Sequence, residues 1–228
     1  MTAKVPDRTT SGGQGREPAA GRRRFGEPGR SRRRQGPSPL AGECLRPLTR
    51  LQVEDRTPEL GDLYARISGG EPWAEARARS AFLRRLAADV RRPGFALLVA
   101  ECAASRGGTV LTGCAHGFPV RGDGPWWRGL YDSLPLSLRK VAEAGRLFAI
   151  SEILVGRRVR TQDQDRDWNL ARRLQQRLLT DHAATLGVTL VNRGDSELLE
   201  ALWSWGWRYV PAAHEPLLAP SCRVLVVR

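Results

Sequence analysis

The 228-residue chain carries 37 lysines and arginines against 24 aspartates and glutamates, a formal net charge of +13. This length suits one folded domain with an added tail and is ample for a single buried core. The positive charge favours polyanionic partners such as nucleic acid or the phosphates of a nucleotide. No stretch of about 18 uncharged apolar residues occurs, which argues against a membrane span. The N-terminal residues lack the apolar segment that is typical of a secretory signal.

The four cysteines, Cys44, Cys102, Cys114 and Cys222, form no C-x-x-C pair. His116 lies near Cys114 but lacks partners at the spacing of a zinc site, so we expect no metal. Cys102 and Cys114 fall in apolar, strand-like runs, which favours buried free thiols. Such thiols fit a reducing compartment, and we expect a cytoplasmic protein.

Residues 1–42 form a segment rich in Gly, Pro, Ser and Arg, with basic clusters at Arg22–Arg24 and Arg32–Arg34. Apolar residues are too few to offset the entropy of ordering, so we expect a disordered tail. Binding of nucleic acid through its arginines is possible in principle. We favour the simpler interpretation of a solvated extension and place the folded domain at residues 43–228.

The first half of that domain indicates an edge strand, two helices and a two-stranded hairpin. These elements are expected over residues 44–48, 56–67, 71–90, 95–103 and 109–118. Pro47 is tolerable in an edge strand, and Thr57 and Pro58 suit a helix start. Gly107 and Gly108 offer a turn that would make the last two strands antiparallel.

Residues 119–146 break the regular pattern, with glycines and a proline ahead of Trp126-Trp127. Long aromatic loops often serve binding sites, so this segment is a candidate for covering a pocket and shaping the choice of substrate. An apolar patch pinned to the core is the alternative interpretation.

The second half alternates strands and helices. A strand is expected over residues 147–155, a helix over 168–186, a strand over 188–191, a helix over 196–204 and strands over 207–210 and 222–227. Gly187 offers a C-terminal stop for the longer helix. The order predicts a mixed α+β class with a β-α-β unit in this half.

The start of the longer helix is a candidate anion site. Unpaired backbone N–H groups and the helix dipole attract phosphate at such a position. Five arginines crowd this corner of the sequence: Arg157, Arg158, Arg160, Arg166 and Arg172. A pyrophosphate bound there would gain charge-assisted hydrogen bonds. A surface helix with ordinary solvated arginines is the alternative.

The same junction resembles motif A of the acyl-CoA-dependent N-acyltransferases of the GNAT superfamily. Members carry Gln or Arg, two residues, Gly, one residue, and then Gly or Ala. Arg166 and Ala171 match this pattern, whereas Asn169 stands where the family has Gly. The family's Gly lets the backbone approach the pyrophosphate closely, and Asn tolerates unusual backbone angles better than most residues.

The segment near the C-terminus resembles motif B of the same family. Leu202 and Gly206-Trp207 match, and Ser196 replaces the family's Asn. Trp203 replaces a Tyr that often serves as general acid toward the departing CoA thiolate; counting back from Gly206 instead puts Leu202 at that position, so neither register supplies a Tyr. Indole cannot donate a proton in that way, so another group or solvent would have to do so.

The resemblance implies a GNAT fold, which is a mixed, mostly antiparallel sheet of six to seven strands splayed between the fourth and fifth, flanked by about four helices. It implies acetyl-CoA as acyl donor in the split, no metal, and a monomer or homodimer. The implied cofactor-binding residues are Ile153, Leu154, Val155, Arg166, Asp167, Trp168, Asn169, Leu170, Ala171, Arg172 and Ser196.

The implied reaction is direct transfer of an acetyl group to a primary amine of a small molecule or a protein. Glu152, on the strand beside the thioester, is the candidate base. A carboxylate held by a neighbouring arginine is its structural alternative. A backbone N–H near Leu154 would stabilise the oxyanion. Glu101, Trp126 and Trp127 are candidate substrate-binding residues.

Two further functions remain open. The chain could be a catalytically weak or non-catalytic GNAT-like protein that binds an acyl-CoA, because Asn169, Ser196 and Trp203 depart from the family's pattern. Nucleic-acid binding through the basic tail is the other. No serine has a histidine at the spacing of a hydrolase nucleophile, so hydrolase chemistry is not indicated.

Overall fold

The computed structural model describes residues 43–69, 71–104, 107–122, 124–156, 169–211 and 221–228. The tail that we expect to be disordered, residues 1–42, lies outside the described residues. No helix in the described part is long and apolar enough to cross a membrane.

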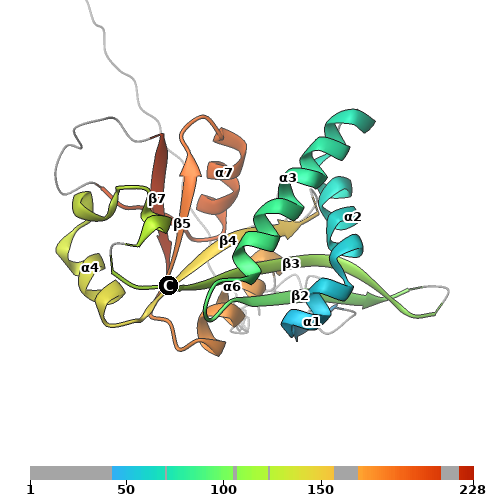
Figure 1. Ribbon diagram of the computed structural model, residues 1–228, viewed down its shortest axis with the longest axis horizontal. Helices are drawn as coiled ribbons and strands as arrows, with labels where there is room; N and C mark the ends of the chain where they lie inside the picture. Colours follow the sequence, from blue (N-terminus) through green and yellow to red (C-terminus); the bar gives the residue numbers. More distant parts are fainter. Residues whose placement is uncertain (1–42, 70, 105–106, 123, 157–168, 212–220) are drawn as a thin grey trace, which may run out of the picture. The chain divides into compact units, whose positions relative to one another are not determined.

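One mixed sheet of seven strands organises the domain, in the order β1-β2-β3-β4-β5-β7-β6 (Figure 1). The strands are β1 (Glu43–Leu48), β2 (Ala96–Ala103), β3 (Thr109–Val120), β4 (Leu147–Val155), β5 (Leu186–Asn192), β6 (Arg208–Tyr209) and β7 (Cys222–Val227). Every neighbouring pair is antiparallel except β4 and β5, which are parallel. The predicted α+β class and mostly antiparallel sheet are therefore confirmed.

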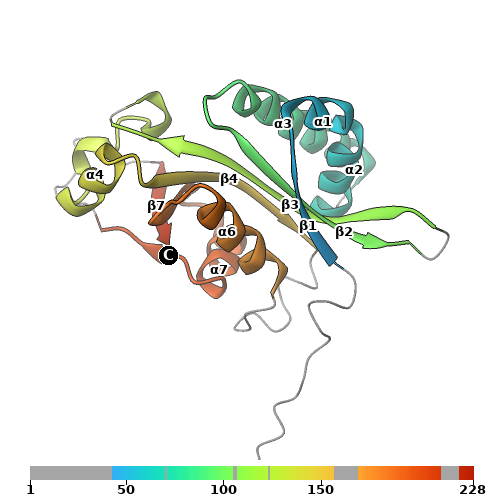
Figure 2. The same ribbon diagram turned by 90° about the horizontal axis from the view of Figure 1, so that it is seen from below.

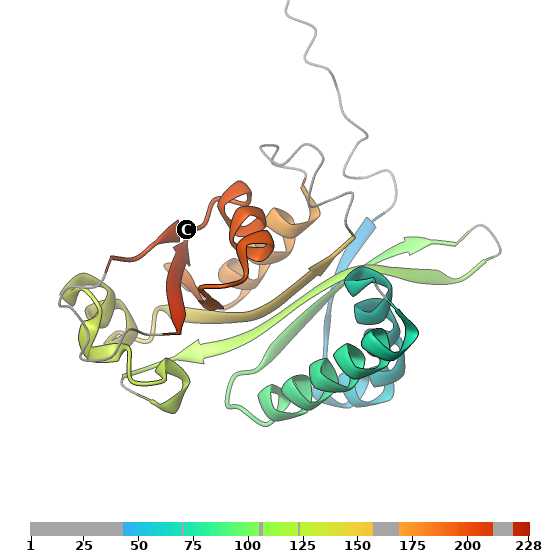
Figure 3. The same cartoon turned by 90° about the horizontal axis from the view of Figure 1, so that it is seen from above.

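Helices cover both faces of the sheet (Figures 2 and 3). On one face lie α1 (Arg50–Asp55), α2 (Thr57–Ser68) and α3 (Pro72–Val90); on the other lie α6 (Leu170–Asp181) and α7 (Ser196–Ser204). Between β3 and β4, two 3₁₀ turns, Pro125–Trp127 and Tyr131–Ser133, precede α4 (Leu136–Glu143). The described residues thus contain six α-helices, where about four were expected.

The N-terminal helices differ from the sequence prediction. The short helix α1 was not expected, although a capping box defines its start: the hydroxyl of Thr49 accepts the N–H of Gln52, whose side chain accepts the N–H of Thr49 in return. Thr57 was expected to cap α2, but it lies within the helix and its hydroxyl donates to the carbonyl of Val53 at 2.9 Å. Arg56 occupies the capping position instead.

The helix expected over residues 168–186 was too long in the prediction, because α6 ends at Asp181. Ala183 follows with a φ of 49°, a left-handed conformation that interrupts the helix. Gly187, expected as the helix stop, lies inside β5. A Cβ added there would lie 2.9 Å from Cγ1 of Val227, so close packing of β5 against β7 requires glycine at this position.

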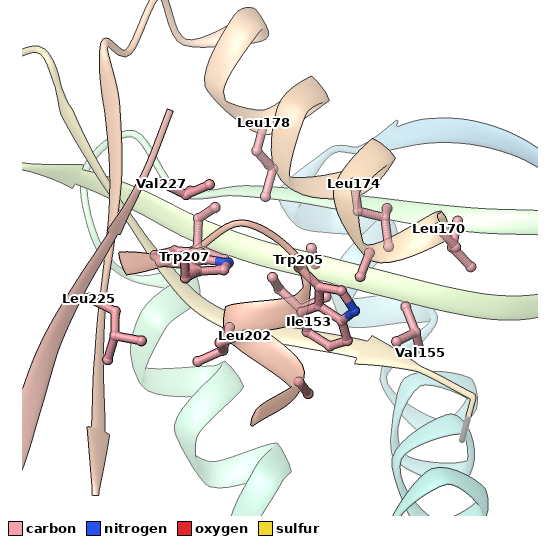
Figure 4. Packing of buried hydrophobic residues seen from close by; sticks show 14 of the residues in the cluster. Ile153, Val155, Leu170, Leu174, Leu178, Leu202, Trp205, Trp207, Leu225 and Val227 are labelled. Atoms are coloured by element: carbon pink, nitrogen blue, oxygen red, sulfur yellow. The ribbon is translucent and has the colours of Figure 1, made fainter. Parts of the chain in front are cut away.

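The core between the sheet and α6 contains two indoles that follow α7 (Figure 4). Trp205 and Trp207 are almost fully buried there, among aliphatic side chains of α6, β4 and β7. The buried amide of Gln175 on α6 donates to the carbonyl of Trp205 and accepts the indole N–H of Trp207, both at 2.9 Å. These bonds fix the turn at Gly206, whose φ of 98° favours glycine.

The opposite face has its own core, formed by α2, α3 and the inward side chains of β2 and β3. Phe82 and Leu86 of α3 are buried in it. Cys114 is buried in this cluster, whereas Cys102 is half-buried and Cys44 exposed. Burial raises the pKa of the Cys114 thiol, which makes this cysteine a packing residue.

Candidate active site

The strands β4 and β5 pair over only three positions each, Leu147–Ala149 with Leu186–Val188. Beyond these positions β4 continues to Val155, while β5 and β7 turn away from it (Figure 1). The expected splay between the fourth and fifth strands is thereby confirmed. From Ile150 onward, the edge of β4 that faces β5 has no strand partner among the described residues. The backbone N–H and C=O groups of such a strand edge can bind an extended ligand.

A cavity of about 390 Å³ lies where the two strands diverge, and we call it the β4–β5 cleft. Its volume falls in the range of small-molecule sites. The strands, α3 and the first 3₁₀ turn all contribute to the lining, which comprises Arg85, Ala88, Asp89, Arg92, Pro125, Trp126, Arg128, Ile150, Ser151, Thr189 and Leu190.

A β-bulge in β4 lies at this cleft. His116 of β3 pairs with Glu152, but the next residue, Gly117, pairs with Ile150, so Ser151 is an extra residue. A bulge bends its strand and redirects side chains, and bulges are frequent next to active sites. The bulge places Ser151 and Ile150 in the lining, with Glu152 directly following.

The carboxylate of Glu152 lies beside the cleft and remains partly accessible to solvent. Its Oε2 is 3.1 Å from Nη2 of Arg85 on α3, and its side chain is 24% exposed. The ion pair anticipated as the structural alternative for Glu152 is therefore present. An ion pair at this exposure contributes little to stability, so it positions the carboxylate without burying it.

Behind this carboxylate, His116 is buried between the sheet and α3. Its ring lies 5.8 Å from that of Phe95 and 6.3 Å from that of Phe82. Neither ring nitrogen has a hydrogen-bond partner among the described residues, and Oδ2 of Asp89 is 3.8 Å from Nδ1. Burial lowers the pKa of His116 to about 4, against the opposing charge of Asp89, so the ring is neutral at pH 7. This environment assigns His116 a structural role.

The N-terminus of α6, predicted to receive a pyrophosphate, is capped by the chain itself. Oδ1 of Asn169 accepts the backbone N–H groups of Ala171 at 3.0 Å and Arg172 at 3.4 Å. Asn169 has a φ of −54°, which is open to any residue. The expectation that Asn serves here by tolerating unusual backbone angles is therefore wrong, and its role is that of a helix cap.

The other predicted cofactor-binding residues have different positions. Ile153 and Val155 point into the core under α6, and Leu154 points into the core under α2 and α3, so only their backbone can meet a ligand. Leu170 and Ala171 are buried. Three of the predicted residues, Arg166, Asp167 and Trp168, lie outside the described residues, as does the charged loop that precedes them.

The two remaining predicted contacts to the cofactor lie near the ends of α6 and α7. Nη2 of Arg172 donates to the carbonyl of Ser204 at 2.8 Å, so this side chain ties α6 to α7. Ser196 is the exposed first residue of α7, and Asp195 caps that helix by accepting the N–H of Leu198 at 3.0 Å. Trp203, which stands where the family has Tyr, is 44% exposed.

Of the predicted substrate-binding residues, Trp126 lines the β4–β5 cleft. Trp127 is fully buried, and its indole N–H donates to the carbonyl of Gly122 at 2.8 Å. Trp126 thus lines a cavity and Trp127 is pinned in the core, and contact of either side chain with a substrate stays a prediction. Glu101 is not among the lining residues of the cleft. Its carboxylate instead binds Arg46 at 3.1 Å and Arg56 at 2.6 Å, which joins β1, β2 and the start of α2.

Several residues of the cleft were not predicted from the sequence: Arg85 and Asp89 on α3, Arg92 just after that helix, Arg128 after the 3₁₀ turn, and Thr189 on β5. No local motif marks them, because they come together only through the packing of α3 and the turn over the diverging strands. The one available signal was the segment Trp126-Trp127-Arg128-Gly129, which places a charge beside an aromatic anchor.

A larger cavity, of about 1020 Å³, lies between α6 and the residues of β1, β5 and β7 beside it. Five arginines line it: Arg172, Arg173, Arg177, Arg208 and Arg228. Its described lining contains no side chain that could act as a base near neutral pH. We therefore place the candidate chemistry in the smaller β4–β5 cleft, next to Glu152.

No protein-family model and no curated protein matches the chain in sequence. Solved N-acetyltransferases are similar to it in structure. The PaiA N-acetyltransferase of Thermoplasma acidophilum, in complex with coenzyme A, is 10% identical with a TM-score of 0.47, over 81% of this chain and 97% of that one. A spermidine N-acetyltransferase of Vibrio cholerae is 11% identical with a TM-score of 0.41, over 81% and 94%.

The aminoglycoside acetyltransferase AAC(6')-Ib in complex with coenzyme A is 14% identical to the chain with a TM-score of 0.46. The match covers 81% of this chain and 94% of that one. Because all these identities are low, the functional argument that follows rests on the cleft's own residues.

Proposed function

We propose that the chain is an acetyl-CoA-dependent N-acetyltransferase that acts in the β4–β5 cleft. The observation that carries this proposal is the position of Glu152, which follows the bulge at Ser151 where β4 parts from β5. A partly accessible carboxylate thereby stands beside a backbone edge that has no strand partner in the described part of the chain, and beside a cavity of small-molecule size. The resemblance of the sequence to motifs A and B supports an acyl-CoA thioester as the donor.

The protein fits the two ends of acetyl-CoA differently. The edge of β4 from Ile150 to Val155, which has no strand partner among the described residues, suits the extended, amide-containing arm of the donor, because strand edges bind extended chains through backbone hydrogen bonds. At α6, the amides of Ala171 and Arg172 are already bound by Asn169. A pyrophosphate there would have to displace or share this cap, so we expect weaker phosphate binding than an uncapped helix would give.

In the proposed reaction Glu152 accepts a proton from the acceptor amine, directly or through water, as its nitrogen attacks the thioester carbonyl. A backbone N–H of the free β4 edge near Leu154 donates to the carbonyl oxygen as negative charge develops on it. The acetyl group moves to nitrogen and the sulfur leaves with the bonding electron pair. The leaving thiolate is protonated by solvent, since the indole of Trp203 cannot donate a proton.

The test is acetyl transfer by the full chain to a panel of primary amines, with free CoA thiol and acetylated product both quantified. We expect thiol and acetylated amine in equal amounts. Thiol release without acetylated amine would indicate thioester hydrolysis and contradict the proposal. Binding of acetyl-CoA without release of thiol with any amine would favour the non-catalytic acyl-CoA-binding protein.

A further inference from the structure

The lining of the β4–β5 cleft is dominated by guanidinium groups. Arg85, Arg92 and Arg128 contribute three positive charges to the described lining, whereas Asp89 is its one carboxylate. Glu152 lies beside the cleft and adds a second negative charge. His116, which contacts Asp89 from behind, is neutral at pH 7. The described groups around the cleft therefore carry an excess of positive charge.

Two of the three arginines are neutralised by carboxylates. Nε of Arg92 lies 3.0 Å from Oδ1 of Asp89, and its guanidinium stacks over the ring of Phe118 at 4.4 Å. Arg85 is paired with Glu152 at 3.1 Å. These pairs hold both arginines against α3 and β4 and leave the excess charge to the third.

Arg128 has no carboxylate partner among the residues that the structure describes. Its described side-chain contact is from Nη1 to Sγ of Cys222 at 3.8 Å, and a thiol is a weak acceptor. The side chain is exposed and lines the cleft. A guanidinium has five N–H donors in a fixed fork that matches an anionic group such as carboxylate or phosphate.

The backbone holds Arg128 in a costly conformation at this point. Its φ is 52°, in the left-handed region that non-glycine residues rarely adopt. The neighbouring Trp127 is fully buried and bonded to Gly122, so the 3₁₀ turn is anchored directly before Arg128. Such strain is retained where the surrounding structure enforces it, and it is concentrated at functional sites.

We infer that the acceptor is a small primary amine that also carries an anionic group, and that Arg128 binds this group. The inference rests on the proposed function and names its substrate class. Arg128 holds the anion, Trp126 and Leu190 offer an apolar wall to the body of the acceptor, and the amine faces Glu152. A cavity of about 390 Å³ selects a small molecule over a folded protein. Polyamines are excluded because they would bring further positive charge to the arginines.

Matched amines with and without the anion test this inference in the full chain. Phenylalanine is compared with phenethylamine, lysine with cadaverine, and phosphoethanolamine with ethanolamine. We expect kcat/KM to be at least about tenfold higher for an anionic member than for its partner, the difference that one charged contact supplies. The pairs also distinguish carboxylate from phosphate as the preferred anion. Equal or higher kcat/KM for every partner that lacks the anionic group would overturn the inference.

Three variants assign the effect to Arg128. Arg128→Gln should lower the preference for the anionic amine to about one, whereas Arg84→Gln, at an exposed arginine of α3 outside the cleft lining, should leave it unchanged. Arg128→Gly should also abolish the preference while relieving the left-handed strain, so its thermal stability should equal or exceed that of the parent. A preference retained in a folded Arg128→Gly variant would contradict the assignment.

A binding measurement separates failure of this inference from failure of acetyl transfer. N-acetylphenylalanine, N-acetylphenethylamine, O-phospho-N-acetylethanolamine and N-acetylethanolamine are each titrated into the full chain by calorimetry. If no amine is acetylated but an anionic probe binds at least about tenfold more tightly than its uncharged partner, the proposed enzyme falls. The anion site stands if both Arg128 variants lose this difference and Arg84→Gln keeps it. Equal binding within both pairs, or no binding of any probe, would overturn the anion site itself.

Discussion

The carboxamide oxygen of Asn169 lies 3.0 Å from the backbone nitrogen of Ala171 and occupies the helix terminus where a pyrophosphate is expected. The same oxygen accepts the N–H of Arg172 at 3.4 Å. The chain thus stabilises its own helix with donors that a phosphate would otherwise use. This relationship makes Asn169 a determinant of both stability and donor affinity.

Replacing Asn169 by glycine should therefore tighten the binding of acetyl-CoA. Asn169→Gly frees the two amides and costs only a few tenths of a kcal/mol in cap energy, whereas Asn169→Ala frees the same amides at a cost of roughly 1 kcal/mol. Calorimetric titration should show a Kd severalfold lower for both variants, with Asn169→Ala the less stable to heat. Unchanged or weaker binding in both would mean that phosphate does not use these amides.

Glu152→Gln should remove proton transfer while preserving the fold. We expect kcat/KM to fall by about 10² to 10⁴, the usual contribution of a general base. Acetyl-CoA binding should be unchanged, and stability should change by less than about 1 kcal/mol because the pair with Arg85 is partly exposed. Glu200→Gln, at an exposed site on α7, is the matched control. Parent-like turnover in Glu152→Gln would exclude this residue as the base.

His116 should make the fold less stable in mild acid. Its pKa is about 4 in the folded chain against an ordinary 6.5, so the unfolded chain binds the proton more readily. Above pH 6.5 the ring is neutral in both states and the free energy of unfolding is unaffected. As the pH falls toward 4, the free energy of unfolding decreases by roughly 3 kcal/mol at most. Urea unfolding at several pH values should show a shallower decline for His116→Leu. Equal declines in both proteins would contradict this role.

Glu101 should matter for stability and not for catalysis. Hydrogen bonds from Arg46 and then Arg56 outweigh burial and hold the pKa of this carboxyl below its usual range. Its stabilisation is therefore present at neutral pH and is lost as the pH falls through the lowered pKa. Glu101→Gln should destabilise the fold by roughly 1–3 kcal/mol, measured by urea unfolding, and leave acetyl-CoA binding unchanged. A selective loss of amine binding would instead support the substrate role predicted from sequence.

The positions of the strands along the chain could be predicted because apolar runs between glycine-rich turns mark strands whatever their tertiary partners. The end of α6 could not be predicted. Leu186 also suits the apolar face of a helix, and only its pairing with β4 places it in β5. Local pattern also placed Glu152 on the correct strand. It could not reveal the pair between Glu101 and Arg46, which are 55 positions apart, or the approach of Arg128 to the cleft.

Calorimetric titration of the full chain with acetyl-CoA is the decisive test of whether the chain uses this donor. We expect saturable binding of one acetyl-CoA per chain, in competition with coenzyme A and unchanged in Glu152→Gln. Absence of binding at millimolar acetyl-CoA, in the parent and in Asn169→Gly alike, would contradict the proposed function. The capped helix would then not explain the missing affinity, and the β4–β5 cleft would not serve an acyl-CoA.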